Sequence, residues 1–330
     1  MKETTDIKDN SRAQQLTVPQ AVIPGSLRAW LLAARPKTLT GAMIPVLVGT
    51  ALALNDGIFR PLSALLCLLF ACGMQVAANF INDLFDYLKG SDREDRLGPE
   101  RACAQGWITP AAMKRGIGVA VALSCMAGLV LLYLTRHALP YQGWELIATG
   151  ILCVLCAFLY TTRLSYLGWG DILVWLFFGL VPVCGTYYVQ GATLTPDVWV
   201  AAVGCGLIID LLLVVNNFRD RDQDAQSGKR TIIVRFGARF GLLYYLVLGI
   251  VASLLILWFA ADSRASAEPQ AAMAFNPTVV LIAILSLYFH VATWRRMCEI
   301  GSGKKLNSIL GETSRNMLLY GLLLSAAILL

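Results

Sequence analysis

Nine long apolar stretches, separated by short polar segments, run through this chain. A membrane-spanning helix needs about 20 predominantly apolar residues, and these stretches are apolar all round rather than along one stripe. The pattern predicts an all-α, multi-pass membrane bundle of nine transmembrane helices, capped at one end by polar loops. The predicted spans are Leu39–Leu54, Leu62–Ile81, Gly116–Leu134, Leu146–Tyr160, Ile172–Val189, Val198–Val215, Phe240–Ala261, Val279–Trp294 and Met317–Leu330.

Composition supports the same class of protein. Of the 330 residues, 57% are hydrophobic and 15% are charged, whereas soluble domains usually carry about 25% charged residues. We expect a polar N-terminal tail over residues 1–27 and a membrane-embedded domain over residues 28–330. These values disfavour a soluble globular protein and exclude a disordered chain.

The basic residues lie almost entirely on one side of the predicted bundle. Of 27 Lys and Arg residues, only Arg60, Arg136 and Arg264 fall in the loops of the opposite side. Basic loops of membrane proteins stay in the cytoplasm. We therefore expect the N-terminus, and the loops that follow the even-numbered spans, to face the cytoplasm.

Polar side chains gather at that same end of the second predicted span. Gln75, Asn79, Asn82, Asp83 and Asp86 recur at helical spacing, so they share one face of the helix. Carboxylates that face lipid are costly, and this face should point into the bundle or a wet cavity.

A matching cluster ends the sixth predicted span. Asn217, Asp220 and Asp224 share a helix face, and Asp210 lies two turns deeper on it. One such cluster is compatible with a solvated helix end. Two matching clusters of amide and carboxylate oxygens instead favour a hard cation such as Mg²⁺, which proteins usually hold with a few carboxylates and substrate phosphates.

Basic side chains interleave with carboxylates in the loops after both clusters. Lys89, Asp92 and Arg101 follow the first, and Lys229 follows the second. Positive-inside charge alone would account for any single one of them. Together they fit a diphosphate that is held by metal ions and countered by Lys and Arg.

These motifs resemble those of the UbiA-type superfamily of intramembrane aromatic prenyltransferases, which have nine transmembrane helices and two aspartate-rich motifs. The first reads Asn82-Asp83-Leu-Phe-Asp86 and continues to Asp92, and the second runs from Asn217 to Asp224. The general pattern places its last aspartate where Gly90 stands. An aspartate at 92, followed by the 95–101 segment DRLGPER, is similar to the 1,4-dihydroxy-2-naphthoate polyprenyltransferase branch of menaquinone biosynthesis.

The resemblance implies transfer of a polyprenyl chain from its diphosphate to 1,4-dihydroxy-2-naphthoate, with loss of CO₂ and diphosphate, to give demethylmenaquinone. It implies Mg²⁺ as cofactor, polyprenyl diphosphate, an aromatic acceptor and the lipid bilayer as partners, and a bacterial cytoplasmic membrane as location. No nucleic acid and no protein partner are expected. The candidate residues are Asn82, Asp86, Asp92, Asn217, Asp220 and Asp224 for metal; Asp83, Lys89, Arg101, Lys229 and Tyr160 for catalysis; and Arg35, Lys37, Gln75, Asn79, Tyr187, Tyr188 and Asp210 for substrate.

Two other functions remain open from the residues. One is a prenyltransferase of the same superfamily with another acceptor, such as 4-hydroxybenzoate, homogentisate or a glyceryl phosphate. The other is a secondary transporter, whose coupling carboxylates usually lie near the bilayer midplane. Only Asp210 approaches that depth here, which disfavours transport.

Overall fold

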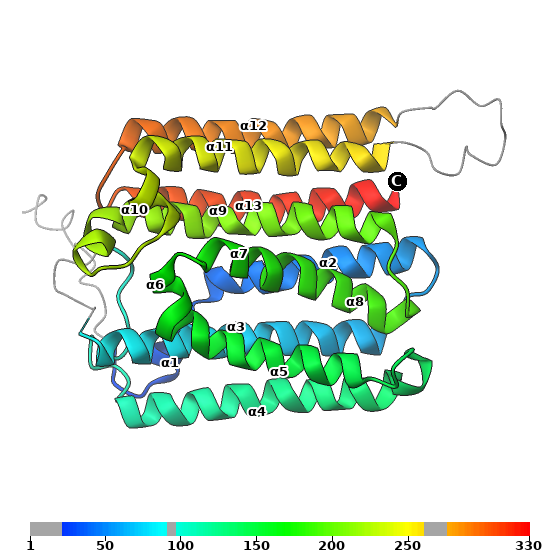
Figure 1. Cartoon of the computed structure of the whole chain (residues 1–330), viewed down its shortest axis with the longest axis horizontal. Helices are drawn as coiled ribbons and strands as arrows, with labels where there is room; N and C mark the ends of the chain where they lie inside the picture. The colour runs from blue at the N-terminus through cyan, green and yellow to red at the C-terminus, as the bar shows by residue number, and fades with distance from the viewer. Residues whose placement is uncertain (1–21, 91–96, 261–275) are drawn as a thin grey trace, which may run out of the picture.

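The structure is a computed structural model that describes residues 22–90, 97–260 and 276–330. Over these ranges the chain is helical, without a strand, and its long helices run side by side as a single layered bundle (Figure 1). The prediction of an all-α, multi-pass membrane protein is confirmed.

The long helices are α2 (Pro36–Asn55), α3 (Pro61–Leu88), α4 (Pro110–Thr135), α5 (Trp144–Leu159), α8 (Val181–Gly191), α9 (Pro196–Gln226), α11 (Ala238–Leu255), α12 (Pro277–Ile300) and α13 (Leu306–Leu329). The short helices are α1 (Leu27–Ala34), α6 (Ser165–Leu167), α7 (Gly170–Val174) and α10 (Ile232–Phe236). Two π-helical segments, η2 (Tyr160–Leu164) and η3 (Trp175–Leu180), connect α5 to α6 and α7 to α8. Two 3₁₀ segments, η1 (Arg136–Ala138) and η4 (Ile256–Ala260), extend α4 and α11.

Proline starts five of the long helices. Pro36, Pro61, Pro110, Pro196 and Pro277 each occupy the first turn. The ring fixes φ near the helical value, and the missing N–H is one that no intrahelical acceptor would satisfy. Several helix starts are therefore visible in the sequence itself.

Seven helices within the described ranges are long and apolar enough to cross a membrane. Seven of the nine predicted spans lie in them, except for Ala261 at the end of one span, which falls outside the described residues. The predicted span Leu146–Tyr160 corresponds to α5, which has 16 residues, and Met317–Leu330 lies in α13. The first half of α13 carries Glu312 and Arg315 among other polar residues, which lowers its hydropathy. The predicted number of nine is thus not confirmed by length and composition.

Helix α9 is the centre of the bundle, with about two thirds of its apolar window buried. Glycines let its neighbours approach closely, as is common between membrane helices. A Cβ on Gly179 would lie 2.7 Å from the Ala202 carbonyl oxygen, and one on Gly206 would overlap the Trp175 ring. The π-helical turn η3 is pressed onto α9 at this point.

The two acidic motifs lie at the same end of the bundle. Helices α3 and α9 run in the same direction, and their carboxyl ends meet the 97–109 loop, α6 and α10 at the left of Figure 1. The α2–α3 and α8–α9 turns lie at the opposite end. The topology therefore brings together two motifs that are separated by more than a hundred residues.

Candidate active site

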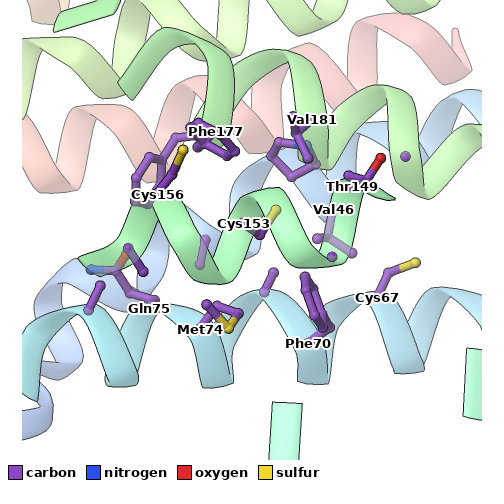
Figure 2. Close-up of a pocket in the computed structure, with 18 of the residues that line it drawn as sticks. Val46, Cys67, Phe70, Met74, Gln75, Thr149, Cys153, Cys156, Phe177 and Val181 are labelled. Carbon is purple, nitrogen blue, oxygen red and sulfur yellow. The ribbon is translucent and has the colours of Figure 1, made fainter. Parts of the chain in front are cut away.

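A cavity of about 530 Å³ opens among the helices below the acidic end. Helices α2, α3, α4, α5, α8 and α9 line it, together with both π-helical segments. Its wall is mainly apolar: Phe70 and Met74 of α3 face Cys153 and Cys156 of α5, and Phe177 closes a further side (Figure 2). Such a wall suits a hydrocarbon chain.

Whereas Thr149 and Thr186 line the cavity further in, amide side chains reach it towards the acidic end. Gln75, Asn79, Asn82 and Asn216 line it there, together with Tyr160. The cavity thus joins an apolar interior to the aspartate-rich helix ends, which is the arrangement that an amphiphile with a charged head requires.

Asp83 is buried and holds a loop. Its side chain is 1% exposed, and its two carboxylate oxygens accept the backbone N–H groups of Ala102 and Cys103, each at 2.8 Å. Both oxygens are therefore occupied by main-chain donors. The carboxylate anchors the loop that carries Arg101 and is not among the residues that line the cavity, so a direct catalytic role for Asp83 stays a prediction.

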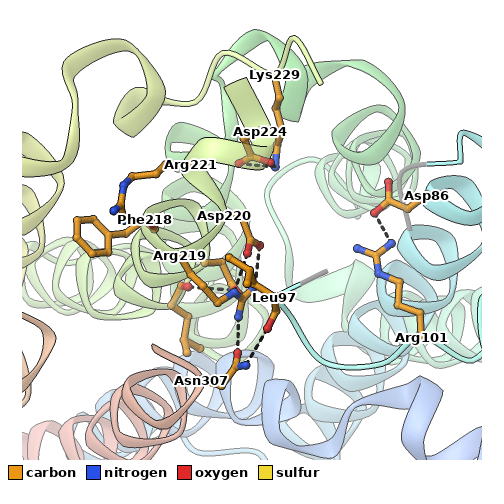
Figure 3. Close-up of polar contacts among 12 residues, drawn as sticks. Asp86, Leu97, Arg101, Phe218, Arg219, Asp220, Arg221, Asp224, Lys229 and Asn307 are labelled. Atoms are coloured by element: carbon orange, nitrogen blue, oxygen red, sulfur yellow. Dashed lines mark hydrogen bonds and ion pairs between the residues drawn. The ribbon is translucent and has the colours of Figure 1, made fainter. Parts of the chain in front are cut away.

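Arg101 joins that loop to the first motif. Its Nη1 donates to the Asn82 carbonyl oxygen at 2.9 Å and to the Asp86 carboxylate (Figure 3). The guanidinium is buried, whereas the Asp86 side chain stays partly exposed. Arg101 contacts one Asp86 oxygen, so the partly exposed carboxylate can still accept from other ligands.

Gln75 and Asn79 connect α3 to the start of α2. Asn79 is buried and donates to the Ala34 carbonyl at 2.8 Å and to Thr38 Oγ1 at 3.0 Å. Gln75 donates to Asn79 and Thr38, and its buried Oε1 has no hydrogen-bond partner. Both side chains line the cavity, where Gln75 presents an open acceptor, and their contact with substrate stays a prediction.

Arg219 fixes the central aspartate of the second motif. Its Nε and Nη2 donate to the two oxygens of Asp220, each at 2.7 Å, and its Nη1 donates to Asn307 of α13 at 2.8 Å. Asn307 in turn donates to the Leu97 carbonyl at 2.8 Å (Figure 3). The guanidinium is 3% exposed, so this fork lies beneath a partly exposed carboxylate.

Asp224 and Lys229 pair one helical turn further on. The Lys229 ammonium lies 3.4 Å from both carboxylate oxygens. The segment that carries Lys229 docks on α6, because the Arg230 N–H donates to the Tyr166 carbonyl at 2.9 Å and Arg235 donates to the Leu167 carbonyl. A Cβ on Gly168, where φ is +85°, would lie 2.3 Å from the Arg230 carbonyl oxygen.

Tyr160 lies between the two motifs. It begins η2 and lines both the large cavity and a small neighbouring one, which it shares with Asp171, Asn217 and Lys229. Carboxylates of both motifs, Asp86 and Asp224, lie within electrostatic reach of its hydroxyl. π-Helical turns occur often at functional sites, and here the turn places this side chain at the cavity mouth.

Tyr187 and Tyr188 lie at the opposite end of the bundle. Tyr187 donates to Asp56, which caps α2, at 2.5 Å. Tyr188 donates to Glu145, in the first turn of α5, at 3.0 Å. Both lie near the end of α8 that points away from the aspartates, and their predicted role in substrate binding stays a prediction.

Three further predicted substrate residues lie outside the cavity lining. Asp210 is buried and accepts from Tyr244 of α11 at 3.1 Å. Arg35 occupies the left-handed turn between α1 and α2, with φ of 52°, and Lys37 is exposed at the start of α2. The adjoining Thr38 lines the cavity instead.

Lys89 and Asp92 complete the predicted set. Lys89 is exposed after α3, with its ammonium 4.3 Å from the centre of the Tyr166 ring on α6. It thus bridges the first motif to the segment on which Lys229 docks. Asp92 lies outside the described residues.

Sequence reasoning missed Thr38, Asn307 and Arg219 as parts of the site. Arg219 stood within the second motif, and its place beside Asp220 was the available signal. Thr38 stood next to the candidates Arg35 and Lys37, whereas Asn307 carried no signal, because it reaches the site from a helix that is distant in sequence.

The oxygen donors at this end fit Mg²⁺. Asp86, Asp220 and Asp224 are partly exposed carboxylates around the cavity mouth, with Asn82 and Asn217 beside them. No group of three or more His, Cys, Asp or Glu side chains in the described ranges could hold a metal ion by itself. An oxygen-only set of this kind, left incomplete by the protein, suits a cation that keeps waters and substrate phosphate oxygens.

Comparisons with known proteins agree with this geometry. Residues 42–299 match the UbiA prenyltransferase family. The chain is 42% identical over 214 residues to 1,4-dihydroxy-2-naphthoate octaprenyltransferase of Escherichia coli, covering 64% of this chain and 69% of the relative. It is 38% identical over 250 residues to the Haemophilus influenzae protein of the same name, covering 74% and 81%. The chain belongs to the UbiA prenyltransferase family.

Solved structures share the fold. A UbiA homolog from Aeropyrum pernix superposes with a TM-score of 0.61 at 16% identity, covering 88% of this chain and 96% of the homolog. A UbiA homolog from Archaeoglobus fulgidus bound to DMAPP and Mg²⁺ gives a TM-score of 0.58 at 16% identity, covering 90% and 99%. This protein is therefore an integral membrane prenyltransferase by family and fold.

Proposed function

We propose that this protein transfers a polyprenyl chain from polyprenyl diphosphate to 1,4-dihydroxy-2-naphthoate at a Mg²⁺-dependent, cytoplasm-facing site in a bacterial membrane. The observation that carries the proposal is the cavity, which is apolar within the bundle and meets two aspartate-rich helix ends at its mouth. The naphthoate acceptor is supported by the relatives named for it, at up to 42% identity.

Asn82, Asp86, Asp92, Asn217, Asp220 and Asp224 would hold the metal. Mg²⁺ bound there would neutralise the diphosphate leaving group. Arg101 and Lys229 pair with two of these carboxylates, and Lys89 lies over the Tyr166 ring at the same end. These three residues would add positive charge where the leaving oxygen becomes negative. As the allylic C–O bond breaks, its electron pair leaves with the diphosphate.

The residues around the cavity keep water from the reacting carbon. An allylic cation would react with water, and the apolar wall formed by Phe70, Met74 and Phe177 excludes it. The Tyr160 ring at the mouth can stabilise positive charge by about 0.5–2 kcal/mol. We place the acceptor against Gln75 and Asn79, whose amides line this end.

The new C–C bond forms at the ring carbon that bears the carboxylate. Loss of CO₂ returns the electron pair of the broken bond to the ring. The balanced products are CO₂, diphosphate and the quinol form of demethylmenaquinone.

The test is an acceptor panel on the purified full-length protein with Mg²⁺ and polyprenyl diphosphates of several lengths. Turnover with 1,4-dihydroxy-2-naphthoate and release of both CO₂ and diphosphate is the expected result. Turnover of 4-hydroxybenzoate or homogentisate, without product from the naphthoate, would overturn the acceptor assignment. Loss of turnover with EDTA, and its recovery with Mg²⁺, is expected in the same assay.

A further inference from the structure

Asn307 bridges the two aspartate-rich motifs from a helix that contains neither. It stands in the first turn of α13, 88 residues from Arg219 and 210 from Leu97. Its Oδ1 accepts from Arg219 of α9, and its Nδ2 donates to the main chain of the loop that follows the first motif (Figure 3).

The chemistry of the two partners fixes the orientation of the amide. A guanidinium only donates and a carbonyl oxygen only accepts. Arg219 Nη1 needs an acceptor and Leu97 O needs a donor. If Oδ1 and Nδ2 of Asn307 exchanged places, neither hydrogen bond could form. Asn satisfies both partners at once, which an Asp, Ser or Ala at this position would not.

The bridge acts on Asp220 through Arg219. The buried guanidinium spends Nε and Nη2 on Asp220, and Asn307 takes Nη1, so three points hold its plane. The Asp220 side chain is partly exposed, so its remaining lone pairs stay available to a metal ion. Partners that orient a metal-binding carboxylate commonly change metal affinity 10- to 100-fold when they are removed.

The bridge also fixes the start of the described loop at Leu97. Further along this loop Arg101 pairs with Asp86, and Asp83 holds the backbone at Ala102 and Cys103. The loop is thus tied to α3 at one point and to α9 and α13 at the other. This sets the spacing between the carboxylates of the two motifs.

We infer that Asn307 is a positioning residue of the metal–diphosphate site, which orients Asp220 through Arg219 and ties the loop of the first motif to α9. The inference rests on the proposed function, since it assigns Asn307 to the same site. It adds a third helix, α13, to a site otherwise built from the two motif helices and their loops.

The experiment measures binding rather than turnover. Mg²⁺ and inorganic pyrophosphate are titrated calorimetrically into the full-length protein in detergent, as wild type, Asn307→Ala, Asn307→Asp and Asn316→Ala. Asn316 is the matched control: it lies on the same helix and donates two hydrogen bonds, to the Phe289 carbonyl and Thr293 Oγ1, away from the site.

We expect wild type to bind the pair and Asn307→Ala to bind about 10-fold more weakly or worse. Asn307→Asp keeps an acceptor for Arg219 but turns an oxygen towards Leu97 O, and it should weaken binding as well. Asn316→Ala should bind Mg²⁺ and pyrophosphate as wild type does, although its unfolding temperature should fall by about as much as that of Asn307→Ala. The KM for polyprenyl diphosphate should rise in both Asn307 variants.

If Asn307→Asp bound Mg²⁺ and pyrophosphate as tightly as wild type, the positioning role of Asn307 would be overturned. The same would follow if Asn316→Ala weakened binding as much as the Asn307 variants do. A failure of wild type itself to bind Mg²⁺ and pyrophosphate would contradict the proposed function instead. The two failures are therefore distinguishable. If Asn307→Ala does not fold, Asn307→Asp decides the question.

Discussion

The Asp86 carboxylate at the end of α3 accepts a hydrogen bond from the buried Arg101 guanidinium, 15 residues further along the chain. The same Nη1 holds the Asn82 carbonyl, so the arginine fixes the last turn of the helix and its aspartate together. Every motif carboxylate near the cavity mouth has such a basic partner within the described part of the chain: Asp220 has Arg219, and Asp224 has Lys229.

Removal of a motif carboxylate should abolish prenyl transfer. Asp86→Ala and Asp220→Ala each delete hard oxygen donors at the cavity mouth, and we expect activity to fall by about 10²-fold or more. The measurement is product formation by protein whose membrane insertion is intact. Asp222→Ala is the control, because that side chain is 82% exposed and its ion pair with Arg221 is long, at 4.0 Å. Full activity in either test variant would remove the metal assignment.

Replacement of Arg101 should affect the diphosphate more than the acceptor. Arg101→Ala leaves Asp86 without its partner and removes positive charge beside the leaving group. We expect a higher KM for polyprenyl diphosphate, a higher Mg²⁺ requirement and an unchanged KM for the naphthoate. Steady-state kinetics with each substrate varied in turn make the distinction. A change confined to the acceptor would contradict the placement.

Asp83 should behave as a structural residue. Asp83→Asn replaces one acceptor oxygen by an NH₂ group that faces a backbone N–H, and an unsatisfied buried donor costs about 1–3 kcal/mol. We expect a lower unfolding temperature in detergent and a proportionate loss of activity, with partial recovery on cooling. An inactive variant of wild-type stability would restore Asp83 to a direct catalytic role.

Gly168 tests the docking of the Lys229 segment. Gly168→Ala places a methyl group on the Arg230 carbonyl oxygen and disfavours a positive φ, so the segment should detach from α6 and activity should fall. Gly118→Ala is the control, since a Cβ at that position of α4 meets no atom within 4 Å. Limited proteolysis between α9 and α11 reports the detachment. Equal protection of both variants would contradict it.

The two ends of the bundle are distinguished by a pair of tyrosines. Tyr160→Leu removes the aromatic ring that we propose stabilises positive charge at the cavity mouth, and it should lower kcat. Tyr187→Phe breaks a hydrogen bond to Asp56 at the far end and should cost stability without changing kcat per folded molecule. Activity normalised to folded protein decides between them. The reverse pattern would contradict this assignment, because it would place the reacting centre at the Tyr187 end of the bundle.

Local sequence determined much of this protein. Membrane helices must satisfy their backbone internally, so the apolar runs predicted the bundle. Helical spacing was enough to put Asn82 and Asp86, or Asn217 and Asp220, on common faces. The acidic motifs and their basic loops were therefore visible without coordinates.

Tertiary structure alone decided what each polar side chain does. Asp83 and Asp86 are three residues apart in one motif. Asp83 is buried and accepts two backbone N–H groups, those of Ala102 and Cys103, whereas Asp86 stays partly exposed. Tyr160 and Tyr187 lie at opposite ends because their helices run in opposite directions. Asn307 joins the site from 88 residues beyond Arg219 and 210 beyond Leu97, since packing of α13 on α9 depends on shape complementarity that no local pattern records.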